Sequence, residues 1–244
     1  MMLLVKYCLV TIVLMIVPIV SVGETRVAVA SNFLATLKLL APLYEKQSGE
    51  KLIISSGSSG KLYAQIINGA PYDVFLSADK FYPEELVVNG IGVDQSRFVY
   101  AKGVMVLWSR ENRLIDPKKL ESCDIQYVAI ANTNTAPYGV AAIQAMRKLN
   151  VFDAVKNKIV RGESVGQAFQ FVASGNAQVG FVALSQVLNP NNNFNREYWQ
   201  IPMDFYSPLE QQAILIKDTR RNRQFINFLR SNEAQKIIKA SGYL

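Results

Sequence analysis

The fold is decided by a stretch that reads Leu52-Ile53-Ile54-Ser55-Ser56-Gly57-Ser58-Ser59-Gly60. Its apolar first part predicts a short buried strand and its Ser/Gly-rich second part predicts a tight turn. The segment 62–68 that follows predicts a helix, which Gly69 ends. Because a strand joined to a helix by a short polar turn is the building unit of α/β proteins, the stretch predicts a mostly parallel sheet flanked by helices.

The same alternation continues outward along the chain. Strands are expected at 25–30, 73–77, 127–131, 159–160, 178–183 and 211–217, and the long β-prone segment 98–108 is interrupted by Gly103. Helices are expected at 34–49, 83–88, 139–149, 165–173 and 222–240. Pro42 is expected to bend or interrupt the first of these helices. The order favours an α/β fold of two lobes, each a mixed, mostly parallel sheet with helices beside it.

The chain can divide into lobes in an economical way. It would leave a first lobe near Gly103 and return to it near Pro208. The expected limits are 24–103 and 208–244 for the first lobe and 104–207 for the second. Because two crossings between lobes make a hinge, the sequence predicts a molecule that opens and closes around a cleft.

Residues 1–23 are interpreted as a secretory signal peptide. One basic residue, Lys6, precedes an apolar run at 7–20, and the small residues Ser21 and Gly23 follow. The alternative is a membrane anchor, but the apolar stretch is shorter than the roughly 18–20 residues that a spanning helix needs. We therefore expect the mature chain in the periplasm.

The composition excludes several kinds of catalysis. The chain of 244 residues has no histidine, so a Ser-His-Asp triad, an HExxH zinc site and a histidine base are impossible. Two cysteines, Cys8 and Cys123, are too few for a disulfide framework or a four-thiolate metal site. Cys123 is interpreted as a buried structural thiol. We expect a protein that is not an enzyme and that needs no cofactor.

Two local patterns resemble known sites but fail on spacing. Gly57 and Gly60 enclose two residues before Lys61, whereas a phosphate-binding P-loop has four between its glycines and a Ser or Thr after its lysine. Asp73 and Asp79 have no third carboxylate in register. A P-loop and a protein-built metal site are therefore not expected.

The charge pattern indicates a small partner. The net charge is +7, and the Lys and Arg residues are scattered. Their densest cluster, at 220–223, is typical of the solvated flank of a helix and not of a nucleic-acid track. No nucleic-acid partner is expected, while mild positive charge favours the approach of an anion.

Small polar stretches recur at the predicted helix starts. They lie at 31–32, 58–60, 135–139 and 163–166. Ordinary helix capping is the simplest interpretation of any one of them. A helix start also presents N–H groups with partial positive charge, and the stretches occur in both predicted lobes. Together they predict a cleft that binds an oxyanion through neutral donors.

Five segments, taken in order, carry a resemblance to a known family. The most specific is Gly-Ala-Pro-Tyr-Asp-Val-Phe-Leu-Ser-Ala-Asp at 69–79. The others are Val-Ala-Val-Ala-Ser-Asn-Phe at 27–33, Ala-Pro-Tyr-Gly at 136–139, Gly-Phe-Val-Ala-Leu-Ser-Gln at 180–186 and Pro-Leu-Glu-Gln-Gln-Ala at 208–213. Across nearly the whole mature chain, the sequence resembles the periplasmic molybdate-binding proteins of molybdate ABC transporters. The resemblance implies a type II periplasmic binding protein fold that closes on molybdate or tungstate.

The resemblance also implies the residues that contact the anion. The matching positions are Ser31, Asn32, Ser59, Ala78, Tyr138 and Val165. The metal would be bound only as the oxyanion, through Ser31, Ser59, Tyr138 and Val165. Some family members supply a tyrosine hydroxyl where this chain has Ala183, so Tyr138 is a candidate to replace it.

The implied partners are the oxyanion and the membrane permease of an ABC importer, and the protein is expected to be a monomer. A binding protein for sulfate, phosphate or a small organic acid is the alternative. An organic acid normally recruits an arginine for its carboxylate, and Arg161 lies near a predicted helix start. An Arg161 side chain in the cleft would favour that alternative.

Overall fold

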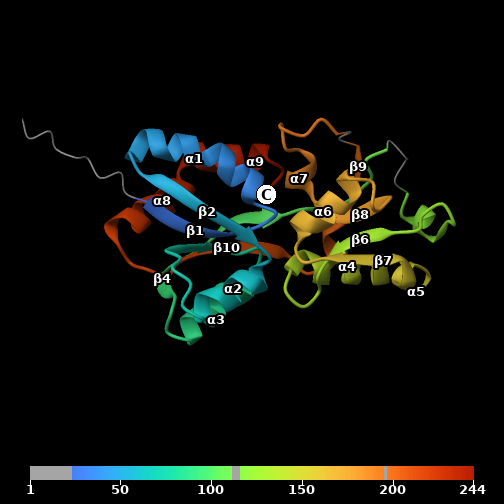
Figure 1. Ribbon diagram of the computed structural model, residues 1–244, viewed down its shortest axis with the longest axis horizontal. Helices are drawn as coiled ribbons and strands as arrows, with labels where there is room; N and C mark the ends of the chain where they lie inside the picture. The colour runs from blue at the N-terminus through green and yellow to red at the C-terminus, as the bar shows by residue number, and fades with distance from the viewer. Residues whose placement is uncertain (1–23, 112–115, 195–196) are drawn as a thin grey trace, which may run out of the picture.

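Two five-stranded sheets stand side by side in the computed structural model, with helices on both faces of each (Figure 1). The structure describes residues 24–111, 116–194 and 197–244, so the predicted signal peptide lies outside the described residues. The predicted α/β architecture of two mixed sheets is confirmed.

The first sheet is built on three parallel strands. Its order is β2-β1-β3-β10-β4, in which β1 runs parallel to β2 and β3, and β10 runs antiparallel to β3 and β4. The bounds are β1 (Glu24–Ala30), β2 (Lys51–Gly57), β3 (Val74–Leu76), β4 (Val93–Gly103) and β10 (Leu209–Leu215). The central strand β3 is buried along its whole length, because helices cover both faces of the sheet.

The second sheet repeats this plan. Its order is β7-β6-β8-β5-β9, with β6 parallel to β7 and β8, and β5 antiparallel to β8 and β9. The bounds are β5 (Met105–Trp108), β6 (Val128–Ala131), β7 (Ile159–Gly162), β8 (Val179–Ala183) and β9 (Tyr198–Gln200). The chain passes from β4 in the first sheet to β5 in the second and returns through β10.

The helices of the first sheet form two layers. α1 (Leu34–Ser48), α8 (Arg220–Arg230) and α9 (Asn232–Ala240) cover one face, where Leu37 and Phe225 pack on Val27 and Val29 (Figure 1). α2 (Ser59–Ile67) and α3 (Phe81–Val88) cover the other face. Each layer buries an apolar cluster of its own, which gives the sheet the rigidity to position its loops.

The second sheet is covered in the same way. α4 (Pro137–Lys148) and α5 (Phe152–Val155) pack on one face, and α6 (Val165–Ala173) and α7 (Leu184–Val187) pack on the other. Short 3-10 turns are η1 (Pro117–Glu121), η2 (Lys156–Lys158) and η3 (Met203–Phe205). Within the described ranges, no helix is long and apolar enough to cross a bilayer.

Three local predictions are corrected. α1 runs unbroken through Pro42, so the helix is not interrupted there, although proline removes one helix hydrogen bond; a bend at Pro42 stays a prediction. The single helix expected at 222–240 is two helices, because Ser231 is extended and its side chain accepts a hydrogen bond from the Ala234 N–H as the N-cap of α9. Cys123 is exposed, so the prediction of a buried thiol is wrong: Leu120 and Ile125 bury themselves on either side of the turn that carries it.

Candidate anion-binding site

The polar stretches singled out in the sequence follow strand ends in both sheets. Ser31 follows β1, Ser58 follows β2, and Ala78 lies just past β3. In the second sheet, α4 and α6 begin after β6 and β7. Because β1, β2 and β3 are parallel, and β6, β7 and β8 are parallel, each set of polar loops gathers at one sheet edge.

The two edges face each other and touch. The Gly166 N–H in the first turn of α6 donates to Ser31 Oγ over 3.0 Å. The Gly60 N–H in the first turn of α2 donates to the Thr135 carbonyl oxygen over 2.8 Å. Both bonds join one sheet to the other, so the structure is a closed arrangement of the two halves.

These contacts gather predicted contact residues from both halves. Val165 precedes Gly166 in α6, and Ser59 precedes Gly60 in α2. Tyr138 lies in the first turn of α4, three residues after Thr135. The predicted positions after β1 and in the first turns of α2, α4 and α6 thus lie on segments that adjoin these two contacts at the seam.

Two hydroxyl groups of the site are oriented by protein N–H groups. Ser59 Oγ accepts a hydrogen bond from the Ala78 N–H over 3.0 Å, and Ser31 Oγ accepts the bond from Gly166. A serine hydroxyl has one proton, and these bonds use its lone pairs and leave that proton free. Both hydroxyls are therefore set to donate to a ligand. The Ala78 N–H is occupied by this bond to Ser59 Oγ, and the anion contact expected at Ala78 stays a prediction.

Backbone N–H groups supply further donors. The N–H groups of Asn32, Ser59, Tyr138 and Val165 have no hydrogen-bond partner in the part of the chain that the structure describes. Ser59, Tyr138 and Val165 lie in the first turns of α2, α4 and α6, where no carbonyl of the same helix is available. Helix starts of this kind attract anions.

The side chain of Asn32 has a different role from its backbone. Its Nδ2 donates to Gln211 Oε1 over 2.9 Å and to the Tyr243 hydroxyl over 3.1 Å. Its Oδ1 is buried and has no partner among the described residues. Because a carbonyl oxygen repels an anion, the backbone N–H is the group of Asn32 that suits an anion.

The Tyr138 hydroxyl lies at the crossing between the two sheets. It accepts a long hydrogen bond of 3.5 Å from Gln211 Nε2, and a Cβ at Gly103 would overlap it. Burial raises the pKa of Tyr138 well above its usual value, so the hydroxyl stays neutral. That Tyr138 replaces the family tyrosine missing at Ala183 stays a prediction.

Sequence reasoning missed the polar network that surrounds Asn32. Ser185 Oγ of α7 donates to the Asn32 carbonyl over 2.9 Å, and the Tyr243 hydroxyl donates to Ser185 Oγ over 3.0 Å. Tyr100 donates from its hydroxyl to Gln211 Oε1 over 3.0 Å. Asn32 and Tyr243 are 211 positions apart, so no local pattern could reveal the contact.

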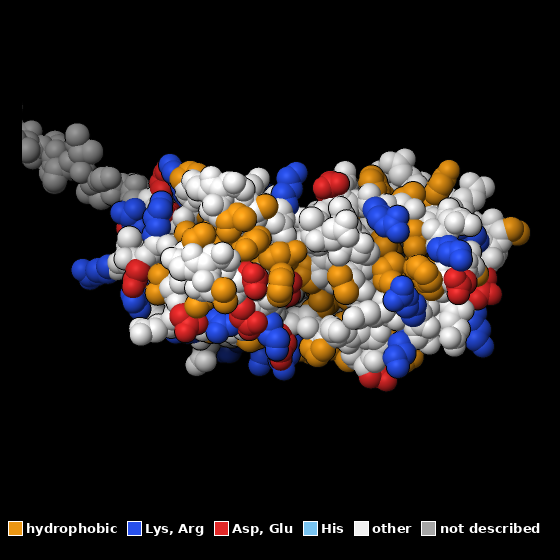
Figure 2. All heavy atoms as spheres, turned by 90° about the horizontal axis from the view of Figure 1, so that it is seen from below, with side chains coloured by type: hydrophobic (Ala, Val, Ile, Leu, Met, Phe, Trp, Pro, Cys, Tyr) orange, Lys and Arg blue, Asp and Glu red, His pale blue; other side chains and the backbone are white. Residues whose placement is uncertain are grey.

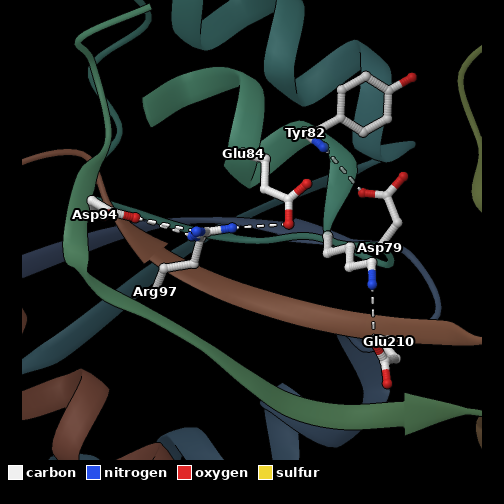
Figure 3. A network of polar contacts seen from close by, with 7 residues as sticks. Asp79, Tyr82, Glu84, Asp94, Arg97 and Glu210 are labelled. Atoms are coloured by element: carbon white, nitrogen blue, oxygen red, sulfur yellow. Dashed lines mark hydrogen bonds and ion pairs between the residues drawn. The ribbon is translucent and has the colours of Figure 1, made fainter. Parts of the chain in front are cut away.

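Charged side chains of the first half pair with one another. Arg97 pairs with Glu84 over 2.9 Å and with Asp94 over 3.2 Å, and Lys80 pairs with Glu210 over 3.4 Å (Figure 3). These contacts keep two cations of the first half occupied by carboxylates.

Asp79 follows Ala78 in the sequence, and its carboxylate accepts hydrogen bonds from groups of the same loop. It accepts a hydrogen bond from Ser77 Oγ over 2.8 Å. It accepts a second from the Tyr82 N–H over 3.4 Å (Figure 3). Burial raises the pKa of the Asp79 carboxyl, and these two bonds oppose the shift.

Arg161 is exposed on the outermost strand β7, and it lines neither of the two grooves at the seam between the halves. The position of Arg161 therefore does not favour an organic acid as the ligand.

Two grooves open at the seam. One of about 790 Å³ is lined by Ser58, Lys61 and Ser164, among others. The other, of about 550 Å³, is lined by Ser31, Lys38 and other residues. Figure 2 shows Lys and Arg side chains spread over both halves, with Asp and Glu among them. The cations lie around the seam, and the gathered donors are neutral.

The arrangement can bind an anion but offers no catalytic chemistry. Across the described ranges, no group of three or more Cys, Asp or Glu side chains can hold a metal ion, and the sequence has no histidine. What the site offers is a set of fixed hydrogen-bond donors from two rigid halves.

Comparisons with known proteins place the chain in a family. Residues 25–244 match the family model of bacterial extracellular solute-binding proteins. The molybdate-binding protein ModA of Azotobacter vinelandii is 44% identical over 91% of this chain and 90% of its own length, and that of Rhodobacter capsulatus is 41% identical over 91% and 88%.

A solved structure agrees with this placement. The periplasmic molybdate-binding protein of Azotobacter vinelandii superposes with a TM-score of 0.85 at 42% identity, covering 91% of this chain and 99% of that one. Proteins of this kind bind a solute and are not enzymes. The chain belongs to the bacterial extracellular solute-binding proteins, in the family of the molybdate-binding proteins ModA.

Proposed function

We propose that this protein captures molybdate or tungstate between its two lobes and delivers it to the permease of an ABC importer. The observation that carries the proposal is that both sides of the seam carry hydrogen-bond donors: two oriented serine hydroxyls, and four N–H groups without a partner among the described residues. The relatives named above, which are molybdate-binding proteins, support the choice of anion.

The proposed contacts divide between side chains and backbone. Ser31 and Ser59 donate from their hydroxyls, and Ser59 also donates from its N–H. Tyr138 and Val165 donate from backbone N–H groups at helix starts, and Asn32 does so from the turn after β1. Neutral donors fixed by rigid elements suit a dianion because desolvating a neutral donor costs far less than desolvating a charged side chain.

The proposed lobes are 24–103 with 208–244, and 104–207. The passage of the chain between the sheets at β4–β5 and again before β10 supports these limits. Closure would be driven by contacts that the anion makes only when both lobes surround it. Residues 1–23 would direct export to the periplasm, where the mature protein would act as a monomer.

Selectivity against sulfate would come from the size of the closed cavity, because both anions are tetrahedral and accept the same hydrogen bonds. Selectivity against phosphate has another origin. Near neutral pH phosphate keeps a proton, which needs an acceptor, and the contacts proposed above are all donors.

One observation favours a second candidate ligand. Asn32 Oδ1 is a buried acceptor without a partner among the described residues. It could accept the proton of a protonated oxyanion such as hydrogen phosphate. This alternative is weaker, because the family relatives are molybdate-binding proteins.

A thermal-shift screen of the purified protein against molybdate, tungstate, sulfate, phosphate and small carboxylates tests the proposal. At about a hundredfold excess over Kd, molybdate or tungstate should raise the Tm by about 5–10 °C, and sulfate far less. Equal shifts for sulfate would remove the selectivity claim, and a dominant phosphate shift would establish the alternative.

A further inference from the structure

Two buried hydroxyl groups at the seam have no hydrogen-bond partner. They are Ser58 Oγ and Thr135 Oγ1, and neither finds a partner among the residues that the structure describes. Folded proteins rarely bury a polar group without satisfying it, because the group loses its bonds to water. An unpartnered buried hydroxyl therefore suggests a hydrogen-bond partner that is not part of the protein, such as a ligand.

The two hydroxyls belong to opposite lobes of the same contact. Ser58 is the N-cap of α2, and Gly60 two residues later donates its N–H to the Thr135 carbonyl. A Cβ at Gly60 would lie 3.0 Å from Thr135 Cα, which shows how closely the two segments approach. Ser58 and Thr135 therefore flank the seam where Ser59 and Tyr138 also lie.

The side chain of Ser58 makes no capping hydrogen bond. An N-cap side chain normally accepts a hydrogen bond from an N–H in the first helical turn. Ser164 does so for α6 by accepting from the Gln167 N–H over 3.3 Å, whereas Ser58 makes no such bond in α2. Ser58 is 4% exposed, so its hydroxyl is largely shielded from bulk water.

We propose that Ser58 and Thr135 are further ligand-contacting residues, each donating its hydroxyl proton to the oxyanion when the lobes are closed. The inference rests on the proposed function and deepens it. Ser58 adds a hydroxyl to the first lobe. Thr135 gives the second lobe a side-chain donor beside its backbone N–H groups, so its contact forms only on closure.

Calorimetric titration of sodium molybdate into the full chain tests the proposal at Thr135. Thr135→Val keeps the shape and the backbone carbonyl that Gly60 uses, but it removes the hydroxyl. We expect its Kd to rise about ten- to hundredfold. Thr135→Ser restores a hydroxyl and should bind close to the wild type. Thr133→Val, a half-buried threonine of the same loop, is the matched control and should bind as the wild type does.

The Tm of the ligand-free proteins separates a ligand contact from a structural role. The Thr135 hydroxyl makes no bond to any described residue, so Thr135→Val should leave the ligand-free Tm unchanged while reducing the shift that molybdate causes. Ser58→Ala should behave in the same way, since no capping bond is lost.

These experiments distinguish a failure of the further inference from a failure of the proposed function. If the wild type binds molybdate and Thr135→Val and Ser58→Ala bind it equally well, the further inference is wrong and the proposed function stands. A lower ligand-free Tm in Thr135→Val with unchanged affinity would assign a structural role and overturn the inference. If the wild type does not bind molybdate, the proposed function and the inference fall together.

Discussion

The two lobes have the same strand plan but contribute different chemistry to the site. In each sheet three parallel strands are followed by an antiparallel strand that has just crossed from the other lobe, β10 in the first and β5 in the second. The first lobe presents serine hydroxyls oriented by N–H groups, at Ser31 and Ser59. The second presents mainly the N–H groups at the starts of α4 and α6.

This difference shows that one fold can supply hydrogen-bond donors either from side chains or from the backbone. A side-chain donor can be deleted by mutation without moving the chain. A backbone donor can only be displaced, by changing how closely the lobes approach. The lobes are therefore expected to respond to different kinds of substitution.

The largest effect is expected from removing a first-lobe hydroxyl. Ser59→Ala deletes a donor to a charged ligand, which should cost about 1.5–3 kcal/mol, or roughly ten- to a hundredfold in molybdate affinity. Titration calorimetry measures this loss. Ser122→Ala, in the turn after η1, is the control and should bind normally. Unchanged affinity in Ser59→Ala would contradict the idea that the first lobe binds the anion through serine hydroxyls.

A smaller effect is expected from moving the second lobe outward. A Cβ at Gly166 would lie 3.0 Å from Ser31 Cβ across the seam, so Gly166→Ala should hold the lobes apart by a few tenths of an ångström. An overpacking cost of about 1 kcal/mol would weaken binding about fivefold. Alanine favours a helix over glycine, so the ligand-free Tm should not fall. Tighter binding in Gly166→Ala would show that α6 is not a closure contact.

The smallest effect is expected from the cations around the seam. Lys38 and Lys61 are exposed and line the two grooves. Replacing either with Gln should slow association about two- to threefold at low salt and leave dissociation unchanged, because these charges guide the anion without holding it. Stopped-flow intrinsic fluorescence at low and high salt checks this. A faster dissociation would mean that a lysine contacts the bound anion.

The helix starts of the site were easier to predict than the polar side-chain network around Asn32. Apolar runs bounded by small polar residues located the strands, and the segment 165–173 matches α6 in full. The helix starts followed from the same pattern, whereas Tyr138 and Val165 were named as anion contacts from the family resemblance. These features are local in sequence, and local physics determines them.

The supporting polar network could not be predicted, because its members are distant in sequence. Asn32 and Gln211 are 179 positions apart, and their hydrogen bond forms only once β1 and β10 share a sheet. The exposure of Cys123 and the break at Ser231 were missed for a related reason. Both depend on how neighbouring segments pack and not on residue type alone.

A crystal structure of the molybdate complex, with the metal located by its anomalous scattering, tests the central claim most directly. We expect the molybdenum between the lobes, with its oxygens bonded to Ser31, Ser59, Tyr138 and Val165 and with no lysine or arginine nitrogen in contact. A metal position away from the seam, or an oxyanion held by a Lys or Arg side chain, would contradict the account.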